Sequence, residues 1–484
     1  MKKFFVTNLI FLLALNLLIK TFWILGIDRS VQNALPMGEY GVYFALLNFT
    51  YLFNILLDLG INSFNNKTIA QNTSVLKKYF ARILPLKLCL SGVYIVLLFC
   101  VSFIVDYDSY ARFLLFWLAI FQILTSLLTY LRSNISALLL FKTDSVLSVL
   151  DKALTILFCS CLLWTSWGKK VFCVEYFVYA QVLSLAISTL VALFICLKKT
   201  GFISLVWNVS FMKAVLKYGF PFALLTLLMS LYNRIDSVML ERILKDNGVA
   251  SEVYASGFRL VDSVNMVAYL FSVILLPLFA KMIKDKINIE EITKISFHLL
   301  LFISLSFALL GFFYSYEIVD YLYTKHVSDS AEVFKILCFC FIPVSMTYIF
   351  GTLLTANGSL KKLNIVAFCG MILNIATNFL LIPYFKEIGS AFAALISQSI
   401  TAILQIIIAV KIFQLKINKN YVFRLLCFVI CMVLCSFAVY KIDIVWTIRL
   451  CISIVLFCAL SLVFRLFNIK EIISLIPIQA KKKE

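Results

Sequence analysis

The 484-residue sequence is 63% hydrophobic and only 14% charged, its mean hydropathy is +1.01, and its formal net charge is +19. A soluble domain is about half apolar and about a quarter charged. This composition therefore excludes a soluble globular protein and leaves no room for a soluble domain. A helix of about 20 mainly apolar residues spans a bilayer, and such runs recur along the whole chain.

The apolar runs predict an all-α integral membrane protein with about fourteen transmembrane helices. They are about twice as long as the strands of a membrane barrel and do not alternate between polar and apolar residues. The first run is longer than the apolar core of a signal peptide and lacks a cleavage site, so we expect a retained helix. The predicted spans lie near 5–25, 38–60, 82–105, 112–132, 145–166, 171–197, 216–243, 252–283, 292–316, 331–355, 363–384, 387–413, 421–440 and 446–467.

The positive charge is concentrated in alternate loops. Lys77, Lys78 and Lys198 lie in one set of loops, whereas Asp106 and Asp108 lie in the opposite, acid-rich set. Because cytoplasmic loops carry an excess of lysine and arginine, this pattern predicts that both termini are cytoplasmic. The charge thus follows the topology, and we expect no nucleic-acid partner.

No motif indicates catalysis, a metal or a cofactor. The 14 cysteines lie almost entirely within predicted spans, where cysteine behaves as a small hydrophobic residue. The two histidines have no partner at ligand spacing, and no phosphate-binding loop occurs. We therefore expect neither an enzyme nor an ATPase.

An internal repeat relates the two halves of the chain. The segment GEYGVYF at 38–44 matches EVYASGF at 252–258 with an offset of 211 residues. The offset predicts two six-helix bundles in the same orientation, related by an axis along the membrane normal. It also aligns two polar stripes, each expected on one helix face: Asn48, Tyr51, Asn54 and Asp58, and Arg259, Asp262, Asn265 and Tyr269. The predicted organisation is a bundle at 1–197, a cytoplasmic linker at 198–215, a bundle at 216–413, and helices 13 and 14 with a basic tail at 414–484.

Ionisable residues at membrane depth are the functional candidates, because each costs about 2.5–3.5 kcal/mol on insertion scales. Lys20, Arg234 and Arg259 are predicted to face one central cavity and to bind an anionic ligand, for which arginine offers a bidentate fork. An alternative interpretation is that these cations form structural ion pairs between helices. Lys87 lies nearer a helix end, where it is expected to snorkel. The polar residues predicted to line the cavity or to couple transport to an ion are Asn48, Asn54, Asp58, Asp236, Asp262 and Asn265.

Several segments resemble the Wzx-type polysaccharide flippases of the multidrug/oligosaccharidyl-lipid/polysaccharide (MOP) exporter superfamily. They are DLGINSFNNKTIA, YLRSNISALLLFKTDSVLSVLDK, YGFPFALLTLLMSLYNRIDSVMLERI and YASGFRLVDSVNMVAYL followed by LPLFAKMIK. The resemblance implies a multidrug and toxin extrusion (MATE)-like fold that alternates between inward and outward states. It also implies a substrate, an undecaprenyl-pyrophosphate-linked oligosaccharide such as an O-antigen unit of lipopolysaccharide.

The same resemblance implies location in the bacterial inner membrane, contact with membrane lipids, and a polysaccharide polymerase in that membrane as a partner. Three alternatives stay open: a flippase for a peptidoglycan precursor or a sterol, a MATE-type drug/cation antiporter, and a polymerase or ligase. An antiporter site would centre on carboxylates, and a polymerase would carry a long external loop. The cations and the short loops favour the flippase.

Overall fold

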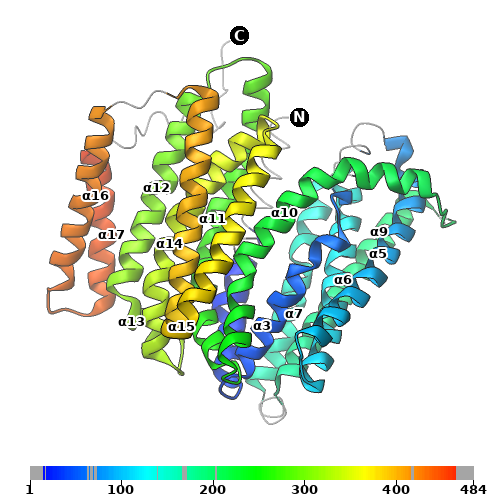
Figure 1. Ribbon diagram of the computed structural model, residues 1–484, viewed down its shortest axis with the longest axis horizontal. Coiled ribbons are helices and arrows are strands. Elements are labelled where there is room, and N and C mark those ends of the chain that lie inside the picture. The colour runs from blue at the N-terminus through cyan, green and yellow to red at the C-terminus, as the bar shows by residue number, and fades with distance from the viewer. Residues whose placement is uncertain are drawn as a thin grey trace. The chain divides into compact units, whose positions relative to one another are not determined.

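The computed structural model describes residues 15–16, 18–62, 65, 69, 73–138, 140–165, 172–201, 204–415 and 419–464. These residues are almost entirely helical and contain no strand (Figure 1). Within these described ranges, eleven helices are long and apolar enough to cross a membrane. The basic tail, most of the first predicted span and Lys67 lie outside the described residues.

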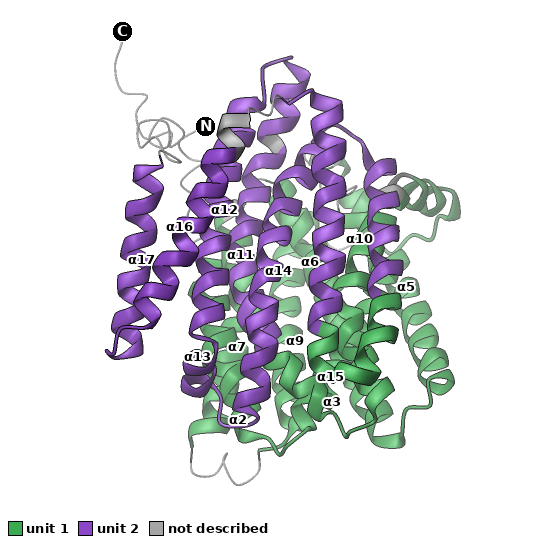
Figure 2. Cartoon of the chain, turned by 60° about the vertical axis from the view of Figure 1, so that its left-hand side comes forward, with its two compact units in different colours: residues 1–256, 375–390 green, residues 257–374, 391–484 purple. Residues whose placement is uncertain are grey.

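Contacts divide the chain into two compact units, shown in Figure 2. Unit 1 comprises residues 1–256 and 375–390, and unit 2 comprises residues 257–374 and 391–484. The predicted bundle boundaries at 197 and 216 stay a prediction.

Unit 1 contains the N-terminal spans and the long helix α10. In it, α3 packs against α6 and α10, and α9 packs against α6 and α7. Its elements are η1 (Trp23–Asp28), α2 (Arg29–Ala34), α3 (Glu39–Leu52), η2 (Asn54–Leu57), η3 (Thr73–Val75), α5 (Leu76–Ile104), α6 (Ser109–Ala137), α7 (Phe141–Trp164), α9 (Val174–Thr200) and α10 (Val209–Leu244), together with the first residues of α11 (Val249–Lys284).

In unit 2, α12 packs against α14, and α16 packs against α17. Its further elements are α12 (Glu290–Phe313), α13 (Ser315–Leu322), α14 (Val327–Ala356), most of α15 (Leu360–Phe413), α16 (Lys419–Tyr440) and α17 (Trp446–Val463).

The observed spans agree with the predicted ones apart from three. The backbone of α15 breaks at Lys386, so this element holds two predicted spans in one. The first predicted span is only partly described, and the second, 38–60, is not one helix: α3 ends at Leu52 and is followed by the 3₁₀ turn η2. These three differences account for eleven long helices where fourteen were predicted.

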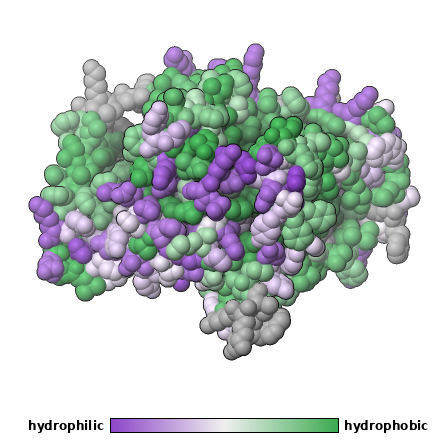
Figure 3. Space-filling model, turned by 60° about the horizontal axis from the view of Figure 1, so that its bottom comes forward, coloured by the Kyte–Doolittle hydropathy of each residue, from purple (hydrophilic) through white to green (hydrophobic). Residues whose placement is uncertain are grey.

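The surface of the spans is apolar, as contact with lipid requires. Ile104, Leu190 and Phe194 are 82%, 64% and 69% exposed, although each lies in a long membrane-length helix. Hydrophilic side chains gather instead on the face that lies at the bottom of Figure 1, where Figure 3 shows them between hydrophobic ones.

Candidate functional site

Arg234 lies in the apolar segment Ala223–Leu244 of α10, and α3 holds its side chain in place. Its Nη1 donates to Oδ1 of Asn48 at 3.3 Å, and its guanidinium carbon lies 4.9 Å from the ring centre of Tyr51. Asn48 is buried and also donates to the hydroxyl of Ser237 at 2.9 Å. The Asn48 amide and the Tyr51 ring are neutral groups, and these two contacts orient the guanidinium.

Asp236 lies two residues further along α10 and is 3% exposed. Its carboxylate accepts hydrogen bonds from the Tyr254 hydroxyl at 3.1 Å and from Nδ2 of Asn378 at 2.7 Å. These donors satisfy a buried carboxylate that would otherwise be costly at this depth. The predicted coupling role of Asp236 stays a prediction.

The polar stripe predicted at 48–58 is divided by the break after α3. Asn48 and Tyr51 lie on the helix, whereas Asn54 lies on η2 and Asp58 in the turn that follows. The prediction of one continuous helical stripe is therefore wrong. The backbone at Leu59 and Gly60 has φ of 44° and 79°, which a helix cannot contain.

Lys87 of α5 satisfies polar groups that this break leaves open, a role that the sequence did not predict. It is 1% exposed, and its Nζ donates to the Leu57 carbonyl at 2.8 Å and to Oδ1 of Asp58 at 2.9 Å. The expectation that Lys87 snorkels to the membrane surface is therefore wrong. The Asp58 carboxylate is the reason, because it provides a charged partner for Lys87 inside the unit.

A small pocket of about 220 Å³ opens beside the break. We call it the Asp58 pocket. It is lined by Tyr51, Asn54, Ile55, Asp58, Gly60, Asn62, Thr125, Ser126, Thr129, Ala223, Thr226 and Ser230.

Lys20 lies elsewhere in unit 1, in the partly described first span. It is half-buried, and the charges that act on it most are those of Asp151, Lys152 and Arg132. One turn before it, Asn16 donates to the Ser148 hydroxyl of α7 at 2.8 Å. Lys20 therefore lies near three charged residues of α6 and α7, of which one is an acid and two are cations.

The two segments of the predicted repeat meet in space within unit 1. Gly41 lies against the backbone of Gly248, and the backbone N–H of Gly38 donates to the Glu252 carboxylate. Glu252 is 1% exposed in the first turn of α11. Gln32 adds a 2.6 Å hydrogen bond to the Ser256 hydroxyl.

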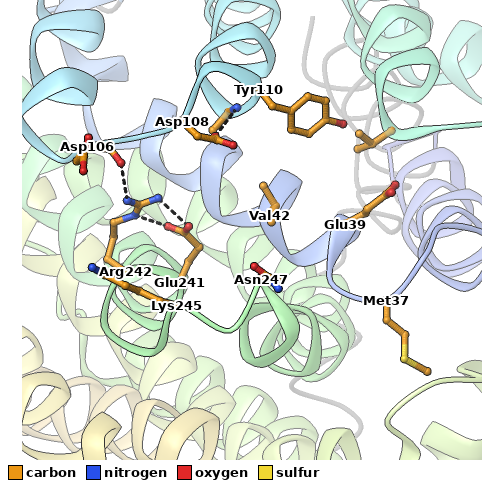
Figure 4. A pocket seen from close by; sticks show the side chains of 12 residues that line it. Met37, Glu39, Val42, Asp106, Asp108, Tyr110, Glu241, Arg242, Lys245 and Asn247 are labelled. Carbon is orange, nitrogen blue, oxygen red and sulfur yellow. Dashed lines mark hydrogen bonds and ion pairs between the residues drawn. The ribbon is translucent and has the colours of Figure 1, made fainter.

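A larger pocket of about 430 Å³ lies at the helix ends near Arg242, and Figure 4 shows its lining. Arg242 makes two hydrogen bonds to Glu241, at 2.6 and 2.8 Å, and donates to the Val105 carbonyl at 3.1 Å. Its guanidinium carbon lies 3.8 Å from the ring centre of Tyr107. Burial raises the pKa of Tyr107, and the Glu241 carboxylate adds to this effect. Through these contacts Arg242 holds loop 105–108 against α10.

The remaining predicted residues lie in unit 2. Arg259, Asp262 and Asn265 are half-buried on α11, which is continuous there, unlike α3. Oδ1 of Asn265 is buried without a hydrogen-bond partner among the described residues. The predicted cavity shared by Lys20, Arg234 and Arg259 stays a prediction.

Similar folds occur in solved structures of the MOP superfamily. One, titled as the lipid II flippase MurJ in an inward closed conformation, is 15% identical, covers 92% of this chain and 98% of its own, and has a TM-score of 0.70. An inward-facing multidrug resistance MATE transporter is 13% identical, covers 81% and 94%, and has a TM-score of 0.64. A Pyrococcus furiosus transporter, whose title reports a binding pocket of reversed polarity, is 12% identical, covers 84% and 94%, and has a TM-score of 0.56.

The spans define a multi-pass membrane protein, and its fold is similar to that of solved transporters of the MOP superfamily. The chain belongs to the polysaccharide biosynthesis protein family, whose model matches residues 6–283. A second model, MatE, matches residues 221–380. A search of the curated proteins found no match to this sequence. The solved structures with this fold are of transporters and a flippase.

Proposed function

We propose that this chain is a flippase that moves an undecaprenyl-pyrophosphate-linked oligosaccharide from the cytoplasmic to the outer leaflet of the bacterial inner membrane. The observation that carries the proposal is Arg234, a guanidinium placed by Asn48 and Tyr51 within a membrane-spanning helix. An arginine fork matches the oxygens of a phosphate. Membership of a polysaccharide biosynthesis family supports a saccharide as the cargo.

The physical task explains why such a cation is needed. The sugar and the pyrophosphate cannot cross hydrocarbon unaided, whereas the lipid tail never has to leave it. A cation at membrane depth offsets the hydration that the pyrophosphate loses. Alternating rocking of the two bundles would expose the site first to one side and then to the other. In this proposal Lys20 and Arg259 provide further positive charge, and Asp58, Asp236 and Asp262 are candidates for ion coupling.

A peptidoglycan precursor is the second candidate cargo. The structure titled as a lipid II flippase covers 92% of this chain. A precursor of that type presents the same anionic group to Arg234, so the two cargoes differ in the saccharide. A polysaccharide polymerase of the same membrane would receive the oligosaccharide.

Alanine substitution of the two arginines tests the proposal. In a strain that lacks the gene, Arg234→Ala or Arg259→Ala should reduce surface polysaccharide at least about tenfold and cause single lipid-linked units to accumulate. Arg234→Lys should retain part of the activity, because it keeps the charge but loses the fork.

Arg449→Ala is the matched control. Arg449 also lies in a membrane-length helix, 5.6 Å from the ring centre of Tyr440, but in α17. It should support normal export at equal protein level. Normal export by both Arg234→Ala and Arg259→Ala would refute the cationic site, and resistance to cationic dyes that depends on this chain would favour an antiporter.

A further inference from the structure

The break after α3 exposes backbone polar groups within the run 38–60 that was predicted to span the membrane. Irregular backbone in a membrane protein is tolerated where it is buried in protein or lines a cavity. Lys87 and Ser126 both donate to the Leu57 carbonyl that the break leaves free, at 2.8 and 3.0 Å. Lys87 also donates to the Ser126 hydroxyl at 3.1 Å, so α5 and α6 hold the broken segment in one conformation.

The broken segment presents one carboxylate to the Asp58 pocket. Oδ1 of Asp58 accepts from Lys87 at 2.9 Å and from the backbone N–H of Asn62 at 3.2 Å. Among the described residues these bonds use only Oδ1, and the side chain, 32% exposed, lines the pocket. Oδ2 is therefore available to a hydrogen-bond donor in the pocket.

The rest of the lining is neutral and rich in hydrogen-bonding groups. Two asparagines come from the broken segment, and four hydroxyls of serine or threonine come from α6 and α10, in addition to Ser126. The Lys87 cation beside Asp58 offsets the carboxylate charge, which disfavours a cationic ligand. The carboxylate itself disfavours a phosphate. The chemistry best matched is a neutral group with several hydroxyls, which is a sugar ring.

Two residues of the pocket lining, Tyr51 and Ser230, connect the pocket to Arg234. The hydroxyl of Ser230, which lines the pocket, donates to the Tyr51 carbonyl at 3.2 Å, and the Tyr51 ring lies against Arg234 one helical turn further along α10. A ligand with a phosphate on Arg234 would thus place its next group at the pocket.

We propose that the Asp58 pocket is a subsite for the sugar ring that adjoins the phosphate of the cargo, with Asp58 accepting its hydroxyls and Lys87 acting as a positioning residue. The subsite rests on the proposed function, because the phosphate contact of Arg234 determines which group reaches the pocket.

Binding to the purified full-length chain in detergent tests the subsite. The probes are the 1-phosphates of glucose, galactose and N-acetylglucosamine, with glycerol 1-phosphate as the probe that lacks a ring. We expect at least one sugar phosphate to bind at least about tenfold more tightly than glycerol phosphate by calorimetry. Asp58→Asn should reduce this ratio to about one, while glycerol phosphate still binds.

Asp144→Asn is the matched control. Asp144 also pairs with a cation, Arg132, at 2.8 Å, but neither residue lines the pocket. It should keep the full ratio. A wild-type chain that binds no sugar phosphate more tightly than glycerol phosphate, or an Asp58→Asn variant that keeps the ratio, would overturn the subsite. Arg234→Ala separates this failure from failure of the proposed function: if it leaves the affinity for glycerol phosphate unchanged, the phosphate contact is wrong.

The role of Lys87 is tested by a pair of variants. Lys87→Met should abolish the preference for the ring, and Lys87→Arg should restore it to within about threefold of wild type. A purely structural lysine would change the melting temperature of both variants without changing the ratio. A folded Lys87→Met variant with the wild-type ratio would contradict the positioning role, and if it does not fold, Lys87→Arg and Asp58→Asn still decide the question.

Discussion

Gly41 and Gly248 bring two backbones into direct contact, which no residue with a side chain allows. A Cβ built on Gly41 would meet the carbonyl of Gly248 and lie 2.7 Å from the backbone nitrogen of Glu252. Neither atom is the flexible end of a side chain, so the helices themselves would have to move apart. Small residues at such interfaces let membrane helices approach closely.

Gly41→Ala should therefore destabilise the protein by at least about 1–3 kcal/mol, the usual cost of overpacking. Gly92→Ala is the matched control, because Gly92 also lies within a helix but has no atom within 4 Å of its built Cβ. It should be neutral or stabilising by up to about 1 kcal/mol, since alanine favours a helix over glycine. Thermal unfolding in detergent measures both, and equal melting temperatures for the two variants would contradict the close contact.

Contacts between residues far apart in the chain could not be predicted from the sequence. The pattern found Asn48, Asp58 and Arg234, because polar residues in an apolar run are visible locally. It did not find that Lys87 pairs with Asp58, 29 residues away, or that Glu252 binds Gly38, 214 residues away. Hydropathy carries no information about partners, so a buried lysine near a helix end looked like one that reaches the membrane surface.

At the scale of elements, the break after α3 is the feature that creates the Asp58 pocket. The apolar run continues through 38–60, so hydropathy alone predicts one helix. Instead α3 ends at Leu52, and beyond η2 the residues Leu59 and Gly60 have positive φ, which costs a non-glycine residue about 1–2 kcal/mol. Lys87 and Ser126 make this conformation stable by binding the Leu57 carbonyl.

Gly60→Ala should destabilise the protein by about 1–2 kcal/mol and also reduce transport, because it disfavours the turn that holds Asp58. Gly358→Ala is the control: Gly358 has a similar φ of 73° with open space around it, in the turn between α14 and α15. It should lose comparable stability in thermal unfolding but keep wild-type surface polysaccharide. If Gly60→Ala exports as well as Gly358→Ala, the turn is not part of the site.

At the scale of the whole molecule, the spans were predictable because their signal is local. Each long helix of the described residues overlaps at least one predicted span, although the ends differ by several residues. Asp108, for example, caps α6 by accepting from the Ala111 N–H at 2.8 Å, so the helix begins at Ser109, three residues before the predicted start at 112. Which helices pack together depends on side-chain contacts across the fold. Hydropathy therefore predicts the spans but not the boundaries between bundles.

The orientation of the chain is the prediction that belongs to the whole molecule. The alternation of basic and acidic loops places the loop that contains Met37 outside and the loop that contains Asp285 in the cytoplasm. Both residues are exposed between helices, so a cysteine at either position should be accessible to a reagent.

In a variant without the 14 native cysteines, Met37→Cys should react with a membrane-impermeant maleimide in cells whose outer membrane alone is permeable. Asp285→Cys should react only after the inner membrane is opened, and a chain with neither cysteine controls for background labelling. The opposite pattern would reverse the topology and with it the direction of the proposed transport. Labelling of both positions from outside would contradict the count of spans between them, because an odd number of crossings must separate the two loops.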